Sequence, residues 1–143
     1  VSGQSFSILR DTSNKVAVSI GSSANNVIST RSLNNTSWNH IGVVILSPDN
    51  NKENSYGTLY NTVIYINGIH VTDLTSRSNA TIQTTKTTSA SADWITLGRT
   101  SNATSNYFAG FMDDVRVYDV ALTPQEIRAI YLNSNNYYKI SLL

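Results

Sequence analysis

The sequence has no cysteine among its 143 residues. This excludes disulfide bonds, thiolate metal sites and cysteine nucleophiles, and it leaves the redox compartment of the protein open. Charged residues make up only 13% of the chain, and the formal net charge is +1. The Lys and Arg residues are scattered without a cluster of three, so the basic footprint of a nucleic-acid-binding protein is absent. No apolar run approaches the roughly 18 to 20 residues that a membrane span needs.

Short alternating or apolar runs recur between polar turns, which is typical of an antiparallel β-sandwich. A chain of 143 residues suits one domain with its own core. The predicted strands are residues 5–11, 15–21, 26–32, 40–46, 62–66, 69–74, 93–98 and 111–119. The strand at 40–46 is apolar on both parities, which indicates a central strand covered on both faces. The polar stretches 47–61 and 75–92 exceed ordinary loop lengths, so each is a functional loop, flexible surface or the place of an unrecognised edge strand.

The clearest local prediction is a hairpin in the stretch VIYINGIHV, residues 63–71. Asn67 and Gly68 lie between two β-branched runs and predict a two-residue type I′ turn, because both turn positions need a positive φ. That turn places Ile66 opposite Ile69.

The helix signal is confined to the end of the chain. Thr123 is a predicted N-cap, Pro124 occupies the first helical position and Glu126 completes a capping box. The helix then continues with one apolar stripe that should seal the edge of the sandwich, and it ends at 133–136. The stripe consists of Ile127, Ile130 and Tyr131.

Four stretches carry a recognisable pattern: SWNHIGVVI (37–45), VIYINGIHV (63–71), ITLGR (95–99) and FAGFMDDVRVYDVALTPQEIRAIY (108–131). Through these stretches the chain resembles the laminin-G-like, concanavalin A-like jelly-roll family. Their order and spacing fit, and the closing strand followed by a capped helix is the most specific part. The resemblance covers residues 5 to 131 and implies an all-β fold. We therefore expect an antiparallel β-sandwich of the jelly-roll type with one short C-terminal α-helix.

The family usually begins with further strands before the point that corresponds to Val1, and no signal peptide is visible here. We therefore predict that residues 1–136 form a sandwich that lacks its first strands. Residues 137–143 form a tail or an added strand. The partner of the exposed sheet edges would be another part of the same polypeptide or a neighbouring subunit.

Asp113 lies in the same alternating row as Phe111, Val115 and Val117, where a carboxylate is costly unless it is paired. The resemblance implies a calcium ion here, because related sandwiches use a carboxylate from this strand together with backbone oxygens. The alternative that we favour is a structural carboxylate at the sandwich rim, which accepts backbone N–H groups or pairs with an arginine such as Arg99.

Aromatic and amide side chains in the polar loops are the candidates for ligand contact. Trp38 and Trp94 stand at strand entries in the resemblance, and we expect both in the core rather than against a sugar ring. A solvated loop surface without a ligand is the alternative for the loop residues. The predicted ligand-binding surface consists of Arg99, Asn102, Asn106, Tyr107, Tyr56 and Tyr60.

The remaining polar motifs carry less weight. His40 and His70 lie on different predicted strands without zinc-ligand spacing, and we interpret both as structural. In a chain so rich in Asn, Ser and Thr, glycosylation sequons are expected by chance. They occur at Asn34, Asn35, Asn79 and Asn102.

No enzyme is predicted. Glycoside hydrolysis needs two carboxylates facing one sugar. The two glutamates are Glu53 in a loop and Glu126 in the capping box. The Glu-X-Asp-X-X-Glu pattern of the glucanase branch is missing.

The predicted function is a non-catalytic glycan-binding or adhesion module. Its expected location is extracellular, on a cell surface or on a particle (virion) surface, and its partners are glycans or a protein. The alternative is a structural subunit or appendage domain of a larger assembly, such as a virion or a surface filament, with no sugar ligand. Both rest on the resemblance, since a fold alone does not decide function.

Overall fold

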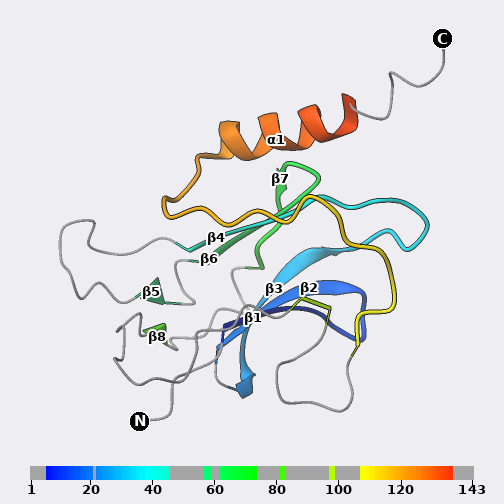
Figure 1. Ribbon diagram of the computed structural model, residues 1–143. Helices are drawn as coiled ribbons and strands as arrows, with labels where there is room; N and C mark the ends of the chain where they lie inside the picture. Colours follow the sequence, from blue (N-terminus) through cyan, green and yellow to red (C-terminus); the bar gives the residue numbers. More distant parts are fainter. Residues whose placement is uncertain are drawn as a thin grey trace. The chain divides into compact units, whose positions relative to one another are not determined.

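The computed structural model describes residues 6–20, 22–45, 57–58, 62–73, 81–82, 97–98 and 107–136 (Figure 1). Contacts divide the chain into two compact units. The first contains residues 1–85 and 120–143, and the second contains residues 86–119. The described strands pair antiparallel, and one short helix follows them, so the expected all-β class with a single helix is confirmed.

The first sheet is an antiparallel meander of β1 (Phe6–Arg10), β2 (Lys15–Ile20) and β3 (Ser22–Ser32). Its first turn is held by Asp11, whose Oδ1 accepts hydrogen bonds from Ser13 N at 2.8 Å and Lys15 N at 2.7 Å. Asn14 completes that turn with a φ of 60°, a conformation that asparagine tolerates better than most residues. The predicted strands 5–11 and 15–21 are confirmed as a hairpin, and β3 begins earlier than the sequence indicates.

The second sheet has the strand order β4-β6-β7, with β4 (Ile41–Ile45), β6 (Thr62–Ile66) and β7 (Ile69–His70). The predicted type I′ turn is confirmed, because Asn67 has a φ of 54° and Gly68 a φ of 73°. Ile66 lies opposite Ile69, as expected. Among the described strands of this sheet β6 is central and β4 lies at the end, so the predicted central position of residues 40–46 is wrong for the described sheet, while their predicted coverage on both faces is confirmed by Val43 and Val44.

A third pairing joins the two long polar stretches. β5 (Gly57–Thr58) pairs antiparallel with β8 (Thr81–Ile82). Each stretch therefore contains a short strand that the alternation pattern does not reveal, which was one of the three interpretations left open.

The two larger sheets share one hydrophobic core within the first unit. Thr30 N donates to Val71 O at 2.6 Å, and Asp73 N donates to Ile28 O at 2.8 Å, so the chain after β7 leaves the second sheet and pairs with β3. The predicted strand 69–74 is thus divided between two sheets. The buried core side chains are Val16, Val18, Val27, Ile64, Ile66 and Val71.

Two buried hydroxyl groups satisfy backbone groups where the ladders are irregular. Ser29 Oγ accepts from Val16 N at 3.0 Å, next to a register shift between β2 and β3. Thr72 Oγ1 accepts from Ile64 N at 2.8 Å, where the chain has left β7. An unpaired buried N–H costs roughly 1–3 kcal/mol, so these side chains permit the departures from regular pairing.

Helix α1 (Pro124–Asn136) covers the outer face of the second sheet, which is visible in Figure 1. Ile127 is buried there together with Val44 and Tyr65. The helix therefore packs on a sheet face rather than at the sandwich edge that the apolar stripe was expected to seal. It has 13 residues, and within the described part of the chain no helix is long and apolar enough to cross a membrane.

In the second unit, residues 107–119 run without a strand, so the predicted strand 111–119 is wrong in this structure. The physical reason is a backbone turn at Asp114, whose φ of 51° interrupts the extended conformation. Phe108 N donates to Gly98 O at 2.7 Å, and Gly98 has a φ of 78°. Residues 137–143, predicted as a tail or strand, lie outside the described residues, as do 93–96 of the predicted strand 93–98.

Candidate functional site

The loop of residues 33–40, between β3 and β4, is held in shape by its own amide groups. Asn39 Oδ1 accepts from Asn34 N at 3.1 Å, while Asn39 Nδ2 donates to Asn34 O at 2.7 Å and to Ser37 O at 3.0 Å. Asn34 Oδ1 accepts from both the backbone N and the hydroxyl of Thr36, at 2.9 and 2.8 Å. These bonds join the two ends of the six-residue segment 34–39, so polar side chains organise this part of the loop.

Both ends of this loop are attached to the first unit. At one end Leu33 packs against the core, and its N donates to Asn14 O at 2.6 Å. At the other end Asn67 fixes His40 from both sides, because Asn67 Oδ1 accepts from His40 N at 2.9 Å and Asn67 N donates to His40 O at 2.9 Å. The ring of His40 lies 6.0 Å from that of Tyr131 on α1. The loop is therefore tied to the β1–β2 turn, the type I′ hairpin and the helix.

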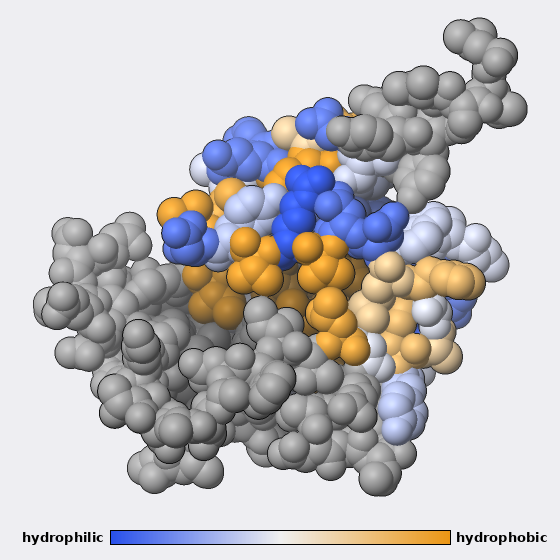
Figure 2. All heavy atoms as spheres, in the orientation of Figure 1, coloured by the Kyte–Doolittle hydropathy of each residue, from blue (hydrophilic) through white to orange (hydrophobic). Residues whose placement is uncertain are grey.

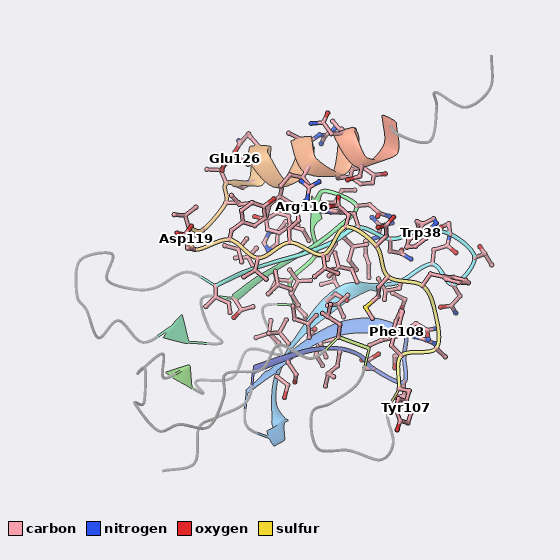
Figure 3. The ribbon with its side chains drawn as sticks, viewed as in Figure 1. Trp38, Tyr107, Phe108, Arg116, Asp119 and Glu126 are labelled. Carbon is pink, nitrogen blue, oxygen red and sulfur yellow. The ribbon has the colours of Figure 1, made fainter. Side chains whose placement is uncertain are left out.

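Trp38 stands on this loop with 57% of its surface exposed, and it is labelled in Figure 3. The expectation that Trp38 belongs to the core is therefore wrong. β4 begins only at Ile41, so Trp38 precedes the ladder and does not enter the sheet's alternation of inward and outward side chains. A flat apolar ring beside amide and hydroxyl groups is the combination that small polar ligands with apolar faces require.

The ligand-binding surface predicted from the sequence is described only in part. Tyr107 is 63% exposed and belongs to the second unit, whereas Trp38 belongs to the first (Figure 3). The predicted contacts that lie outside the described residues are Arg99, Asn102, Asn106, Tyr56 and Tyr60. Trp94, which was predicted to lie in the core, is also outside them.

Asp113, the predicted calcium ligand, is exposed, and its Oδ1 accepts a hydrogen bond from Asp114 N at 2.8 Å. The next carboxylate is engaged by a guanidinium, since Arg116 donates to both oxygens of Asp114 at 2.7 and 2.8 Å. The hydrogen bond to Asp114 raises the pKa of Arg116 above its ordinary value. Among the described residues, no three His, Asp or Glu side chains gather as a metal site. Calcium binding at Asp113 therefore stays a prediction.

The histidines lie against the second sheet. His70 Nε2 is 2.8 Å from Thr72 Oγ1, and its ring lies 5.7 Å from that of Tyr65. Burial raises the pKa of the Tyr65 hydroxyl. Among the described residues, neither His40 nor His70 belongs to a group of three His, Cys, Asp or Glu side chains that could hold a metal ion.

Glu126 has the structural role that the sequence predicts. Its Oε2 accepts from Thr123 N at 2.7 Å and from Thr123 Oγ1 at 2.8 Å, which confirms the capping box at the start of α1. Both hydrogen bonds lower the pKa of this carboxyl. The bond from Thr123 N has the larger effect, and the bond from the Thr123 hydroxyl has the smaller one. A carboxylate used in this way caps the helix and does not face a ligand.

Comparisons with known proteins complete the description of the chain. No curated protein matches it. One solved structure, an S-layer domain-containing protein (residues 221–444) from Clostridium thermocellum ATCC 27405, is 22% identical, with a TM-score of 0.44. That similarity covers 92% of this chain and 64% of the other. A family model described as the concanavalin A-like lectin/glucanases superfamily matches residues 1–128. The resemblance seen in the sequence is thereby confirmed, and the chain belongs to the laminin G-like branch of the concanavalin A-like lectin/glucanase superfamily.

Proposed function

We propose that the chain is a non-catalytic recognition module of a surface or extracellular protein, and that it binds glycans through the loop 33–40. The observation that carries this proposal is the exposed Trp38 on a loop that is fixed by hydrogen bonds at both ends and within itself. Membership of a superfamily that contains lectins supports the choice of glycans as the ligand class.

A loop that is already ordered binds with a smaller entropic cost than one that must be ordered by its ligand. Sugar rings present apolar C–H faces between hydroxyl groups. Trp38 would cover such a face while neighbouring loop amides bond the hydroxyls. Covering about 60 to 100 Å² of apolar surface contributes roughly 1.5 to 2.5 kcal/mol. Loss of the indole should therefore weaken binding by about tenfold to seventyfold.

Absence of catalysis is part of the proposal, because the superfamily also contains glucanases. The described carboxylates that have identified partners support it. Glu126 caps α1, Asp11 holds the β1–β2 turn and Asp114 is paired with Arg116. A glycosidase instead needs two carboxyl groups free to face one substrate.

The test is a glycan array followed by titration calorimetry on any glycan that binds. Trp38→Ala should lose most of the affinity, while Trp38→Phe keeps an aromatic face and should retain part of it. Tyr107→Ala is the matched control, since it removes an equally exposed aromatic ring from the other unit. If Tyr107→Ala abolishes binding and Trp38→Ala does not, the ligand surface predicted from the sequence is right and the loop 33–40 is not the site.

Calcium enters the same experiment as a separate arm. The array is repeated with calcium and with a chelator, and the bound glycans are tested against Asp113→Asn. Binding that needs calcium and is lost in Asp113→Asn supports the predicted metal ligand. Binding that survives chelation leaves Asp113 with its hydrogen bond to Asp114 N as its only identified role.

A second candidate function is a structural module of an assembly. The observation that favours it is the run of exposed apolar side chains in the second unit, which includes Phe111 and Val117. Failure of a folded sample to bind any glycan would favour this candidate.

A further inference from the structure

The segment 111–119 exposes apolar side chains to an extent that its described surroundings do not explain. Phe111 is 87% exposed and Val117 is 77% exposed. Figure 2 shows hydrophobic and hydrophilic residues side by side on the visible face. Contiguous exposed apolar side chains on a soluble protein indicate an interaction surface. The exposed large apolar residues of the segment are Phe111, Met112, Val115, Val117 and Tyr118.

The backbone of the same segment has little internal pairing. Within the described part of the chain, its main-chain hydrogen bond is the one from Asp114 N to the side chain of Asp113. The sequence of the segment nevertheless alternates in the manner of a strand. A row of unpaired backbone groups with strand-like side chains is a template for adding a strand.

The charges of the segment show which strand fits. In an antiparallel pair centred on Val115, Asp114 of one copy lies opposite Arg116 of the second copy, and Arg116 lies opposite Asp114. The same face places Met112 opposite Tyr118 twice, and thioether–aromatic contacts are favourable. Opposite charges directly across an antiparallel pair stabilise it, whereas like charges destabilise it. On this face the segment is therefore complementary to itself, while the other face sets Asp113 opposite Val117 and Phe111 opposite Asp119.

We propose that residues 111–119 pair with the same segment of a second copy as antiparallel strands centred on Val115. In the free chain, Asp114 has a φ of 51° and forms an ion pair with Arg116 of its own segment at 2.7 Å. In an extended strand, residues two apart lie on the same face roughly 6.6 Å from each other, so Arg116 can reach both Asp114 of its own segment and Asp114 of the second copy. On pairing, Asp114 straightens, and each Arg116 faces Asp114 of the second copy, so the two ion pairs within the two chains become two between them.

The free arrangement offers little resistance to this exchange. Both partners of the ion pair are about half exposed, with relative side-chain exposures of 47% and 45%, and exposed pairs contribute little. The left-handed conformation is itself unfavourable for a residue with a Cβ. Straightening Asp114 relieves that strain and exposes main-chain groups in the orientation that a second strand needs. The inference concerns the second unit and does not depend on glycan binding by the first.

The experiment measures self-association of the full chain by sedimentation velocity across a concentration series. The wild-type protein should show a reversible monomer–dimer equilibrium. Arg116→Asp places carboxylates opposite each other at both ion-pair positions, and Asp114→Arg places guanidinium groups there. Each variant should weaken the dimer by about tenfold or more. Circular dichroism checks that both variants remain folded, which is expected because both side chains are exposed.

Two further samples separate register-specific pairing from unspecific apolar association. An equimolar mixture of Arg116→Asp and Asp114→Arg restores both opposite-charge contacts, so the mixture should dimerise about tenfold or more tightly than either variant alone. The double variant Asp114→Arg, Arg116→Asp should regain self-association. A wild-type chain that stays monomeric throughout the series overturns the proposal. Dimerisation of Arg116→Asp and Asp114→Arg with the affinity of the wild type overturns it as well. A mixture of the two variants that fails to associate has the same consequence.

Discussion

Replacing Gly68 with alanine should destabilise the protein for two separable reasons. The first is the backbone, because Gly68 has a φ of 73°, where a Cβ costs about 1–2 kcal/mol. The second is the helix. A Cβ on Gly68 would lie 3.2 Å from Tyr131 Cδ1 and 3.3 Å from the Cα of Arg128. Overpacking of this kind costs about 1–3 kcal/mol. The total loss in the free energy of unfolding should be about 2–5 kcal/mol.

Gly42→Ala is the matched control, because it tests close packing without the backbone cost. A Cβ on Gly42 would lie 3.3 Å from Cγ2 of Ile127 and 3.5 Å from Cβ of Tyr65, and Gly42 has no positive φ. The nearest atom is the end of a side chain, which can move by the few tenths of an ångström required. We expect Gly42→Ala to cost about 1 kcal/mol, at the lower end of the overpacking range.

A double-mutant cycle with Tyr131→Ala isolates the contact between the hairpin turn and the helix. Tyr131→Ala removes the nearest atom that a Cβ on Gly68 would meet. Gly68→Ala should therefore cost about 1 kcal/mol less in the Tyr131→Ala background than in the wild type. The backbone part of the cost should remain in both backgrounds, because it depends on φ alone.

The assay is urea unfolding followed by far-UV circular dichroism, with the slope m compared between variants to check that the unfolded states are alike. Equal costs for Gly68→Ala and Gly42→Ala would refute the backbone part of the reasoning. Equal costs of Gly68→Ala with and without Tyr131 would refute a steric contribution from Tyr131, since the contact with the Cα of Arg128 remains in both backgrounds. A Gly68→Ala protein within about 0.5 kcal/mol of the wild type would refute both.

Two further predictions concern the helix α1. Ile127→Ala removes a side chain that is buried with Val44 and Tyr65, so urea unfolding should show a free energy of unfolding lower by about 2–5 kcal/mol. The control is Arg128→Ala on the exposed side of the helix, which should cost far less. Glu126→Gln concerns pH. Because the folded pKa of Glu126 lies below its ordinary value of 4.5, its stabilising contribution is present above that pH and is lost as the pH falls through the folded pKa. Thermal melts between pH 6 and 3 should therefore show less loss of stability on acidification in Glu126→Gln than in the wild type, and identical profiles would contradict the role of this carboxyl.

Local sequence signals predicted the hairpin and the helix start. Asn67 and Gly68 specify their turn through their own backbone preferences, and the capping bonds of Thr123 and Glu126 span only three residues. These features need no knowledge of the remaining chain. For the same reason, the strand before the hairpin was located at its observed bounds, Thr62–Ile66, and the strand after it at its observed start, Ile69, although β7 ends four residues before the predicted end at 74.

Position within a sheet could not be predicted in this way. Residues 40–46 are apolar on both parities, and the structure explains this through coverage on both faces, with Val43 against the shared core and Val44 against α1. Coverage on both faces does not require a central strand, because a helix can cover the outer face of a strand at the end of a sheet. The pattern records burial and not strand order.

The error over Trp38 has a related cause. A tryptophan just before an apolar strand is compatible with the first position of the ladder or with the loop before it. The choice depends on where pairing with β6 begins, which is at Ile41. The hydrogen bonds between Asn34 and Asn39 keep residues 34–39 in a loop, and this amide pair is the signal that sequence reasoning missed.

The segment 111–119 shows most directly what alternation can and cannot establish. Alternation describes the side chains that a strand would present, but a strand exists only when its backbone groups have a partner. Without one, short-range bonds compete, and here Asp113 accepts from Asp114 N while Arg116 holds Asp114 in a turn. Such bonds contribute little individually, so a suitable partner strand can displace them. The strand-like sequence and the turned structure are then two states of one segment, and the proposed pairing selects between them.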